Sequence, residues 1–358
     1  MGTISERPRK NGSIGYNAQV VVQRDGKVQR ESKTFDRRQA AAAWIKKREH
    51  ELAQPGAVGR AKVEEPTLGD AIDRYSRETA NIGRSKAQVL RAIRGMSIAE
   101  TACSDLTNAE ISSFIQELRQ GRTPATVANY VWHLSAVLRD ARKGWGWLVN
   151  PDAIKDAAFV ALRQGAMGKS QRRERTPTLD EMDRLMTHFG RIRHRRPSSL
   201  PMQQIVAFAL FSTRRQEECL RITWADLDEP QSRILVRDMK HPGSKVGNDH
   251  WCELTPEALA IIQAMPRTDA RIFPFNTDAV SASFTRACAF LGIEDLHFHD
   301  LRHCGVTRLF EMGRNVPQVA AVSAHQSWLS LKRYTHVSHK GDRFAGWPWL
   351  KVVTEPMS

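Results

Sequence analysis

The sequence has little that would place this protein outside the cell or in a membrane. Its 358 residues include five cysteines, and no two of them form a Cys-x-x-Cys pair, which argues against a disulfide framework and a cysteine zinc site. No apolar run approaches the ~18 residues that a membrane span needs. Residues 1–6 also lack the apolar segment of a signal peptide. We therefore expect a reduced, cytoplasmic protein without membrane contact.

Acidic residues are in short supply relative to basic ones. The chain has 54 Lys and Arg against 39 Asp and Glu, a formal net charge of +15. Such an excess favours a polyanionic partner, and nucleic acid is the commonest one, although a basic face also suits anionic lipid. A hydrophobic content of 41% is ordinary for a soluble protein, and the length suggests two or three domains.

The first segment, 1–60, is small and basic, with thirteen Lys and Arg against six Asp and Glu. Alternation around Tyr16–Val22, a turn signal at Asp25-Gly26 and a second run through Val28–Thr34 predict a β-hairpin. Arg37–Glu51 predicts a helix behind it. This pattern is typical of a small DNA-binding module, and it equally fits a solvated edge strand with a cationic surface.

Residues 66–162 predict an all-helical domain. Thr67 and Thr107 each precede an acidic residue by three positions, which is a capping-box pattern, and Thr123 precedes a proline that suits the first helical position. The segment 163–176 is rich in Arg and Gly, and we interpret it as a basic linker.

A third domain is expected over 177–340, because Thr178 and Glu181 form another capping box. Two runs, Ser232–Met239 and Asp249–Leu254, predict a hairpin, and the remainder reads as helical. The tail, 341–358, is apolar enough to pack either on its own chain or on another subunit. The expected fold is thus multi-domain and mainly α with small β-sheets (α+β).

Four segments of the third domain carry side chains suited to one chemistry. They are the run with Arg215 and Glu218, the hairpin with Lys240 and Lys245, the run His299-Asp300-Leu301-Arg302-His303, and His325 with Tyr334 nine residues later. Taken singly, each has a structural explanation, such as a surface ion pair or a solvated lysine. Taken together, two arginines, two histidines and a lysine can surround one phosphodiester.

Such a site needs no metal ion. Arginine binds phosphate oxygens through its planar fork and stabilises the added charge of a pentavalent transition state. A tyrosine, with an ordinary pKa of ~10, becomes a nucleophile when a base or a cationic pocket assists it. His299 and His303 could instead share a metal, as in His-Glu-x-x-His proteases, but Asp300 replaces the glutamate and no third ligand is clear.

These motifs resemble those of the tyrosine recombinases, the phage integrase family. The family's first box, Thr-Gly-x-Arg-x-x-Glu before Leu-x-Trp-x-Asp, matches the run from Ser212 to Asp226, and its arginine is Arg215 rather than Arg214. The His-x-x-Arg box matches His299 to Arg302. The family's Leu-Gly-His and Arg-Tyr-x-His appear as Ser323-Ala324-His325 and Arg333-Tyr334-Thr335-His336. Thr213 and Ala324 replace two usual glycines.

The resemblance implies a role for each matched residue. Tyr334 would form a 3′-phosphotyrosyl link, while Arg215, Arg302 and His325 hold the phosphoryl oxygens. His299 would assist proton transfer, and Lys240, or else Lys245, would protonate the 5′-oxygen. Glu218 and His303 would orient the catalytic side chains without contacting the phosphate themselves. No cofactor, metal or ATP is expected.

The resemblance also implies a site-specific DNA recombinase, most simply the integrase of a phage or other mobile element in the bacterial cytoplasm and nucleoid. Its partners would be two double-stranded DNA sites, three further copies of itself in a tetramer, and accessory DNA-bending or directionality factors. Residues 1–60 would bind arm-type sites and 66–162 core sites. The alternatives are a type IB topoisomerase-like nicking-closing enzyme and a catalytically silent DNA-binding regulator.

Overall fold

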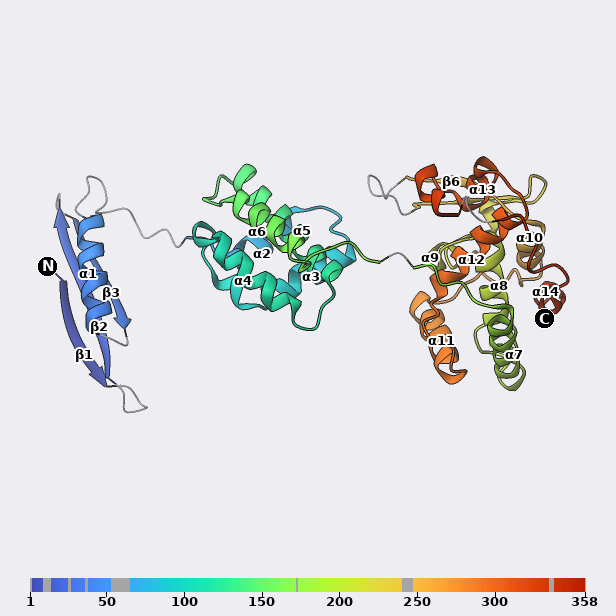
Figure 1. Cartoon of the computed structure of the whole chain (residues 1–358), viewed down its shortest axis with the longest axis horizontal. Coiled ribbons are helices and arrows are strands. Elements are labelled where there is room, and N and C mark those ends of the chain that lie inside the picture. Colours follow the sequence, from blue (N-terminus) through green and yellow to red (C-terminus); the bar gives the residue numbers. More distant parts are fainter. Residues whose placement is uncertain are drawn as a thin grey trace. The chain divides into compact units, whose positions relative to one another are not determined.

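A computed structural model describes residues 2–8, 14–24, 27–35, 38–52, 65–171, 173–239, 247–334 and 338–357. The chain divides into two compact units, Met1–Gln171 and Arg172–Ser358, which are considered separately (Figure 1). Helices dominate, with two small antiparallel sheets, which confirms the expected fold class. Within the described ranges, no helix is both long and apolar enough to cross a membrane.

The first sheet contains β1 (Gly2–Pro8), β2 (Ile14–Arg24) and β3 (Lys27–Phe35), and α1 (Arg38–Leu52) packs against it (Figure 1). The predicted hairpin is confirmed as the β2–β3 pair, while its Asp25-Gly26 turn lies outside the described residues. Strand β1 was not predicted. It is an edge strand that pairs with β2 and contacts α1, and its sequence has no apolar alternation to signal it.

The predicted helical region contains α2 (Leu68–Glu78), α3 (Arg84–Arg94), α4 (Asn108–Arg119), α5 (Pro124–Lys143) and α6 (Pro151–Arg163). Thr67 and Thr107 cap α2 and α4 with both halves of the capping box in place, and Thr123 caps α5. These caps satisfy backbone N–H groups that a helix start leaves unpaired. The three predicted helix starts are confirmed.

The second unit is ordered as α7 (Leu179–Arg195), α8 (Met202–Ser212), α9 (Gln216–Cys219), β4 (Leu227–Asp228), β5 (Arg233–Val236), β6 (His250–Glu253), α10 (Pro256–Gln263), α11 (Thr277–Phe290), α12 (Phe298–Glu311), α13 (Val316–Ser323), short 3₁₀ turns η4 (Trp328–Ser330) and η5 (Lys332–Tyr334), and α14 (Pro348–Thr354). The predicted hairpin is confirmed as β5–β6, and β4 adds a third antiparallel strand. The hairpin's turn lies outside the described residues.

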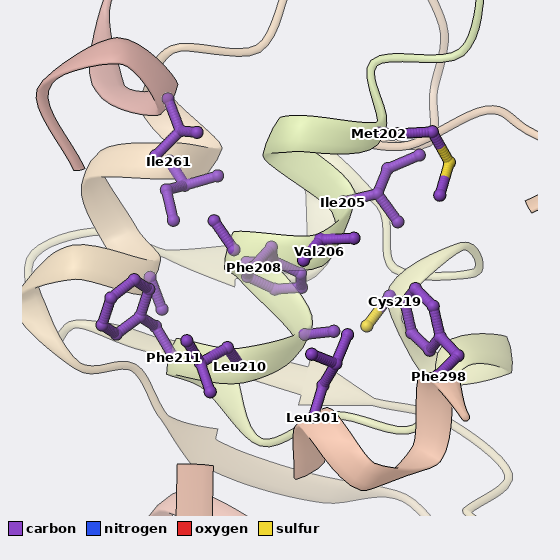
Figure 2. Packing of buried hydrophobic residues seen from close by; sticks show 14 of the residues in the cluster. Met202, Ile205, Val206, Phe208, Leu210, Phe211, Cys219, Ile261, Phe298 and Leu301 are labelled. Carbon is purple, nitrogen blue, oxygen red and sulfur yellow. The ribbon is translucent and has the colours of Figure 1, made fainter. Parts of the chain in front are cut away.

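Helix α8 is the centre of this unit, because every one of its residues is buried. A helix that is apolar on all sides needs neighbours all round. Figure 2 shows Phe208 and Phe211 of α8 among Ile261 of α10 and Leu301 of α12. Helix α12 approaches closely at Gly305, where a Cβ atom would overlap the carbonyl oxygen of Leu210. This packing brings the end of α8 and the middle of α12 together.

The tail after residue 340 packs within its own unit, where helix α14 contacts α8 and α10. Trp347 is buried against Phe211 and donates its indole N–H to Asp183 Oδ1 at 2.9 Å. The buried Arg308 of α12 donates to both carboxylate oxygens of Asp342, at 2.7 and 2.6 Å. The described part of the tail thus packs on its own chain, and docking on another subunit stays a prediction.

The end of the basic segment 163–176 is anchored rather than free. Arg173 donates to the buried carboxylate of Asp300 at 2.9 Å and to Asp295 at 2.8 Å. Arg175 pairs with Glu181 in the first turn of α7 at 2.5 Å. These two arginines therefore belong to the second unit, where acidic side chains bind them.

Candidate active site

Two neighbouring arginines at the end of α8 differ in what they contact. The side chain of Arg214 is 1% exposed, and it donates to the Ser212 carbonyl at 3.2 Å, to Cys252 Sγ at 3.0 Å and to the Val322 carbonyl. The side chain of Arg215 is 31% exposed and donates to Glu218 Oε1 at 2.7 Å. The exposed guanidinium therefore belongs to Arg215, the arginine predicted from motif spacing.

Glu218 fixes the position of Arg215 from the buried side. Its second carboxylate oxygen accepts the Arg215 backbone N–H at 3.0 Å. Burial alone would raise the pKa of this carboxyl, but Arg214, Arg215 and Arg302 outweigh burial and hold the pKa below its usual range. Glu218 is thus a buried anion beside a group of cations.

Arg302 joins the ends of two helices. It donates to the carbonyl of Thr213 after α8 and, at 3.0 Å, to the carbonyl of Ser323 at the end of α13. Burial, followed by repulsion from Arg214 and Arg215, lowers its pKa to about 9. Arg302 is still a cation at neutral pH, and the crowding of positive charge favours a bound anion at this point.

The two helix ends that Arg302 joins have left-handed backbone conformations. Thr213 has a φ of 57° and Ala324 a φ of 52°. Left-handed backbone suits glycine, which is the family's usual residue at both positions. Thr213 and Ala324, which replace the family's glycines, therefore keep the turn geometry. Their Cβ atoms make this left-handed backbone conformation locally strained.

His325 lies directly against Arg302. Its Nε2 atom is 3.2 Å from the Arg302 guanidinium, and its Nδ1 atom is 2.7 Å from Ser323 Oγ. Burial, then Arg302 and Arg215, lowers the His325 pKa to about 3, so the ring is neutral at pH 7. Ser323 was missed from the sequence, although its carbonyl and hydroxyl hold Arg302 and His325 respectively; its place just before the Ala-His pair was the available signal.

Tyr334, in η5, faces helix α12. Its hydroxyl lies 2.5 Å from His303 Nδ1, and its ring stacks on Phe310 with an interplanar angle of 15°. The side chain belongs to a small hydrophobic cluster separate from the main core, which we call the tyrosine cluster: Val306, Leu309, Phe310, Val319, Val322, Leu331 and Tyr334. Burial raises the phenol pKa, and Arg333 and Arg302 act against that rise.

The remaining predicted residues fall in two groups. His299 is on α12, one turn before His303, and the two rings meet edge to face at 5.0 Å; burial, then Arg302 and Arg215, lowers the His299 pKa. Lys240, Lys245 and His336 lie outside the described residues, so the choice of lysine stays a prediction. Among the described residues, no three His, Cys, Asp or Glu side chains are grouped to hold a metal ion.

Residues 176–340 match the Phage integrase family. The matched segment, just under half of the chain, belongs to this family, the tyrosine recombinases. The chain is a site-specific DNA recombinase, an enzyme that transfers DNA strands. It is 29% identical over 291 residues to the shufflon-specific DNA recombinase of Escherichia coli, which covers 77% of this chain and 70% of that protein.

Two solved structures show the shared fold. A lambda integrase tetramer bound to a Holliday junction superposes with a TM-score of 0.57 at 19% identity, over 90% of this chain and 95% of that one. The Tn1549 transposon integrase in complex with a circular intermediate DNA gives a TM-score of 0.57 at 13% identity, over 75% and 94%. The lambda comparison extends over most of both units, so it includes more than the segment that carries the motifs.

Proposed function

We propose that the protein integrates and excises a mobile element by cutting DNA with Tyr334 as the nucleophile. One observation carries the proposal: Arg302 connects the ends of α8 and α13, so that Arg215 and His325 lie beside it, while the same helix α12 holds the Tyr334 hydroxyl. Three distant parts of the sequence thus supply cations and a nucleophile to one place.

The chemistry follows from the charges. Arg215, Arg302 and His325 bind the non-bridging oxygens of the scissile phosphate, and they stabilise the additional charge of the transition state more than the ground state. Tyr334 Oη attacks phosphorus, and the 5′-oxygen leaves with a proton from Lys240 or Lys245. His299 assists proton transfer. The 3′-phosphotyrosyl bond conserves the energy of the phosphodiester, so rejoining needs no ATP.

The wider assembly is part of the proposal. Residues 1–60 bind arm-type DNA, 66–162 bind the core site, 163–176 connect them to the catalytic domain at 177–340, and 341–358 form the tail. Four copies act on two duplex sites in the bacterial cytoplasm, with accessory bending and directionality factors. The lambda relative has been solved as a tetramer on a Holliday junction, which supports this arrangement.

The direct test is covalent capture. The protein is mixed with a library of nicked duplexes that contain random core sequence, and adducts that survive denaturation are isolated and sequenced. Wild type should yield adducts enriched in one site, and Tyr334→Phe should yield none. Adducts from Tyr334→Phe would refute the assignment of the nucleophile, and a lack of adducts from wild type would favour the silent regulator.

The captured site then separates recombinase from topoisomerase. Two plasmid-borne copies should recombine in the presence of the protein and any required accessory factor. Relaxation of supercoils without exchange between the copies would favour the nicking-closing alternative.

A further inference from the structure

The contact between His303 and Tyr334 indicates a role for His303 that the motif spacing did not indicate. His303 Nδ1 is the nitrogen that lies 2.5 Å from the phenolic oxygen, whereas His299 meets the ring of His303 instead. Both groups are mostly buried, so water has little access to the phenol. The phenolic proton therefore has a protein acceptor already in place.

We propose that His303 is the general base that removes the proton from Tyr334 when this residue attacks DNA. The inference rests on the proposed function, because it concerns the same nucleophile. A neutral imidazole accepts at Nδ1 when its own hydrogen is on Nε2, and the short contact requires one of the two groups to donate. The phenol is the donor, because a buried tyrosine with a raised pKa keeps its proton.

The proton balance closes in both directions. As the Oη–phosphorus bond forms and the phosphorus–O5′ bond breaks, the phenolic proton moves to Nδ1, and the proposed lysine protonates O5′. His303 becomes an imidazolium. In the rejoining step the 5′-hydroxyl attacks the phosphotyrosine, the lysine takes up the hydroxyl proton, and His303 returns its proton to the departing phenolate.

The surroundings keep His303 ready to accept. Burial comes first, followed by His299 and Arg333, in lowering its pKa to about 4; Arg302 acts in the same direction and Asp300 against it. These groups lie on α12 and η5 together with Tyr334 itself, and His325, which follows α13, also interacts with His303. A bound phosphodiester adds a negative charge to this cationic site, which raises the His303 pKa toward neutrality and strengthens it as a base.

The test is the pH profile of single-turnover cleavage, with the nicked duplex obtained by capture. His303→Asn keeps an acceptor oxygen near Nδ1 but cannot take a proton, so its rate at pH 7 should fall by about 100-fold or more. The wild-type rate should drop as the pH falls through the His303 pKa and level off above it. The His303→Asn rate should instead climb continuously toward alkaline pH as the phenol ionises unaided.

Two further variants make the result decisive. Added imidazole should restore cleavage by His303→Ala in proportion to its unprotonated fraction, which a purely structural role would not allow. His194→Asn, an exposed position on α7 outside the site, is the control and should keep the plateau of the wild-type profile. A wild-type plateau in His303→Asn, or a folded His303→Ala that imidazole does not rescue, would overturn the assignment; if His303→Ala does not fold, the His303→Asn profile decides.

These outcomes are separate from failure of the proposed function. Loss of the adduct in wild type, or its survival in Tyr334→Phe, removes the nucleophile itself. A normal adduct that depends on Tyr334 but not on His303 removes only the base.

Discussion

At the scale of single residues, burial divides the work between adjacent side chains. Arg214 donates its hydrogen bonds to carbonyl groups and a thiol inside the fold, while the guanidinium of Arg215 is partly exposed to solvent. The exposed guanidinium of Arg215 can meet a substrate phosphate directly, whereas a buried charge that loses its partners destabilises the fold.

The pair Arg215→Ala and Arg214→Ala should therefore separate activity from stability. Arg215→Ala should bind DNA but cleave about 100-fold or more slowly, because one transition-state donor is lost. Its melting temperature should fall less than that of Arg214→Ala, because the buried Glu218 still has Arg214 and Arg302 nearby. Arg214→Ala should lower the melting temperature. Calorimetry and the adduct assay measure the two effects, and normal cleavage by Arg215→Ala would show that the wrong arginine had been chosen.

Ala324→Gly should stabilise the protein. Left-handed backbone costs a residue with a Cβ atom about 1–2 kcal/mol, and the greater freedom of glycine in the unfolded chain returns about 0.4–1 kcal/mol of that. We expect a net gain of about 0.5–1 kcal/mol in the free energy of unfolding, measured by urea denaturation. Ala320→Gly, within the same helix, is the control and should destabilise; a loss of stability in Ala324→Gly would contradict the strain argument.

Much of the site could be predicted at this scale. The contacts that could not be predicted all have the same cause. Spacing within the boxes distinguished Arg215 from Arg214, because Glu218 and Trp224 stand at fixed offsets. The contact of His303 with Tyr334 spans 31 positions and depends on how η5 packs on α12. No local pattern encodes that distance, so the sequence alone favoured His299 for the proton transfer.

At the scale of elements, close packing of two helices holds the site together. Helix α12 touches the backbone of α8 at Gly305, which sets the separation between Thr213 and Arg302. Helix starts were predictable because capping residues mark them in the sequence. The edge strands were missed because β4 is short and β1 lacks an alternation of apolar and polar residues.

Gly305→Ala should test that packing. The new methyl group has no room beside the Leu210 carbonyl, so the helices must separate at a cost of about 1–3 kcal/mol. The free energy of unfolding and the cleavage rate should both fall. Gly95→Ala, whose Cβ would meet only ordinary contact at 3.6 Å, should change stability by no more than about 0.5 kcal/mol; equal effects of the two changes would argue against the close approach.

At the scale of the whole molecule, the net charge of +15 favours binding to the DNA backbone. Each phosphate neutralised releases counterions, so the association constant should fall steeply with salt. For about 6–10 phosphate contacts, the affinity should decrease by about 10³–10⁵ between 50 and 200 mM salt. Fluorescence anisotropy with a labelled duplex measures the slope, and a flat dependence would mean that the basic surface does not meet the DNA backbone.

The tyrosine cluster has a consequence for how the enzyme fails on heating. Because its seven side chains lie apart from the main core, loosening them costs less free energy than melting the whole unit. A warmed sample should lose the ability to cleave DNA strands while it still binds DNA. The temperature that halves adduct formation should therefore be lower than the temperature that halves DNA binding.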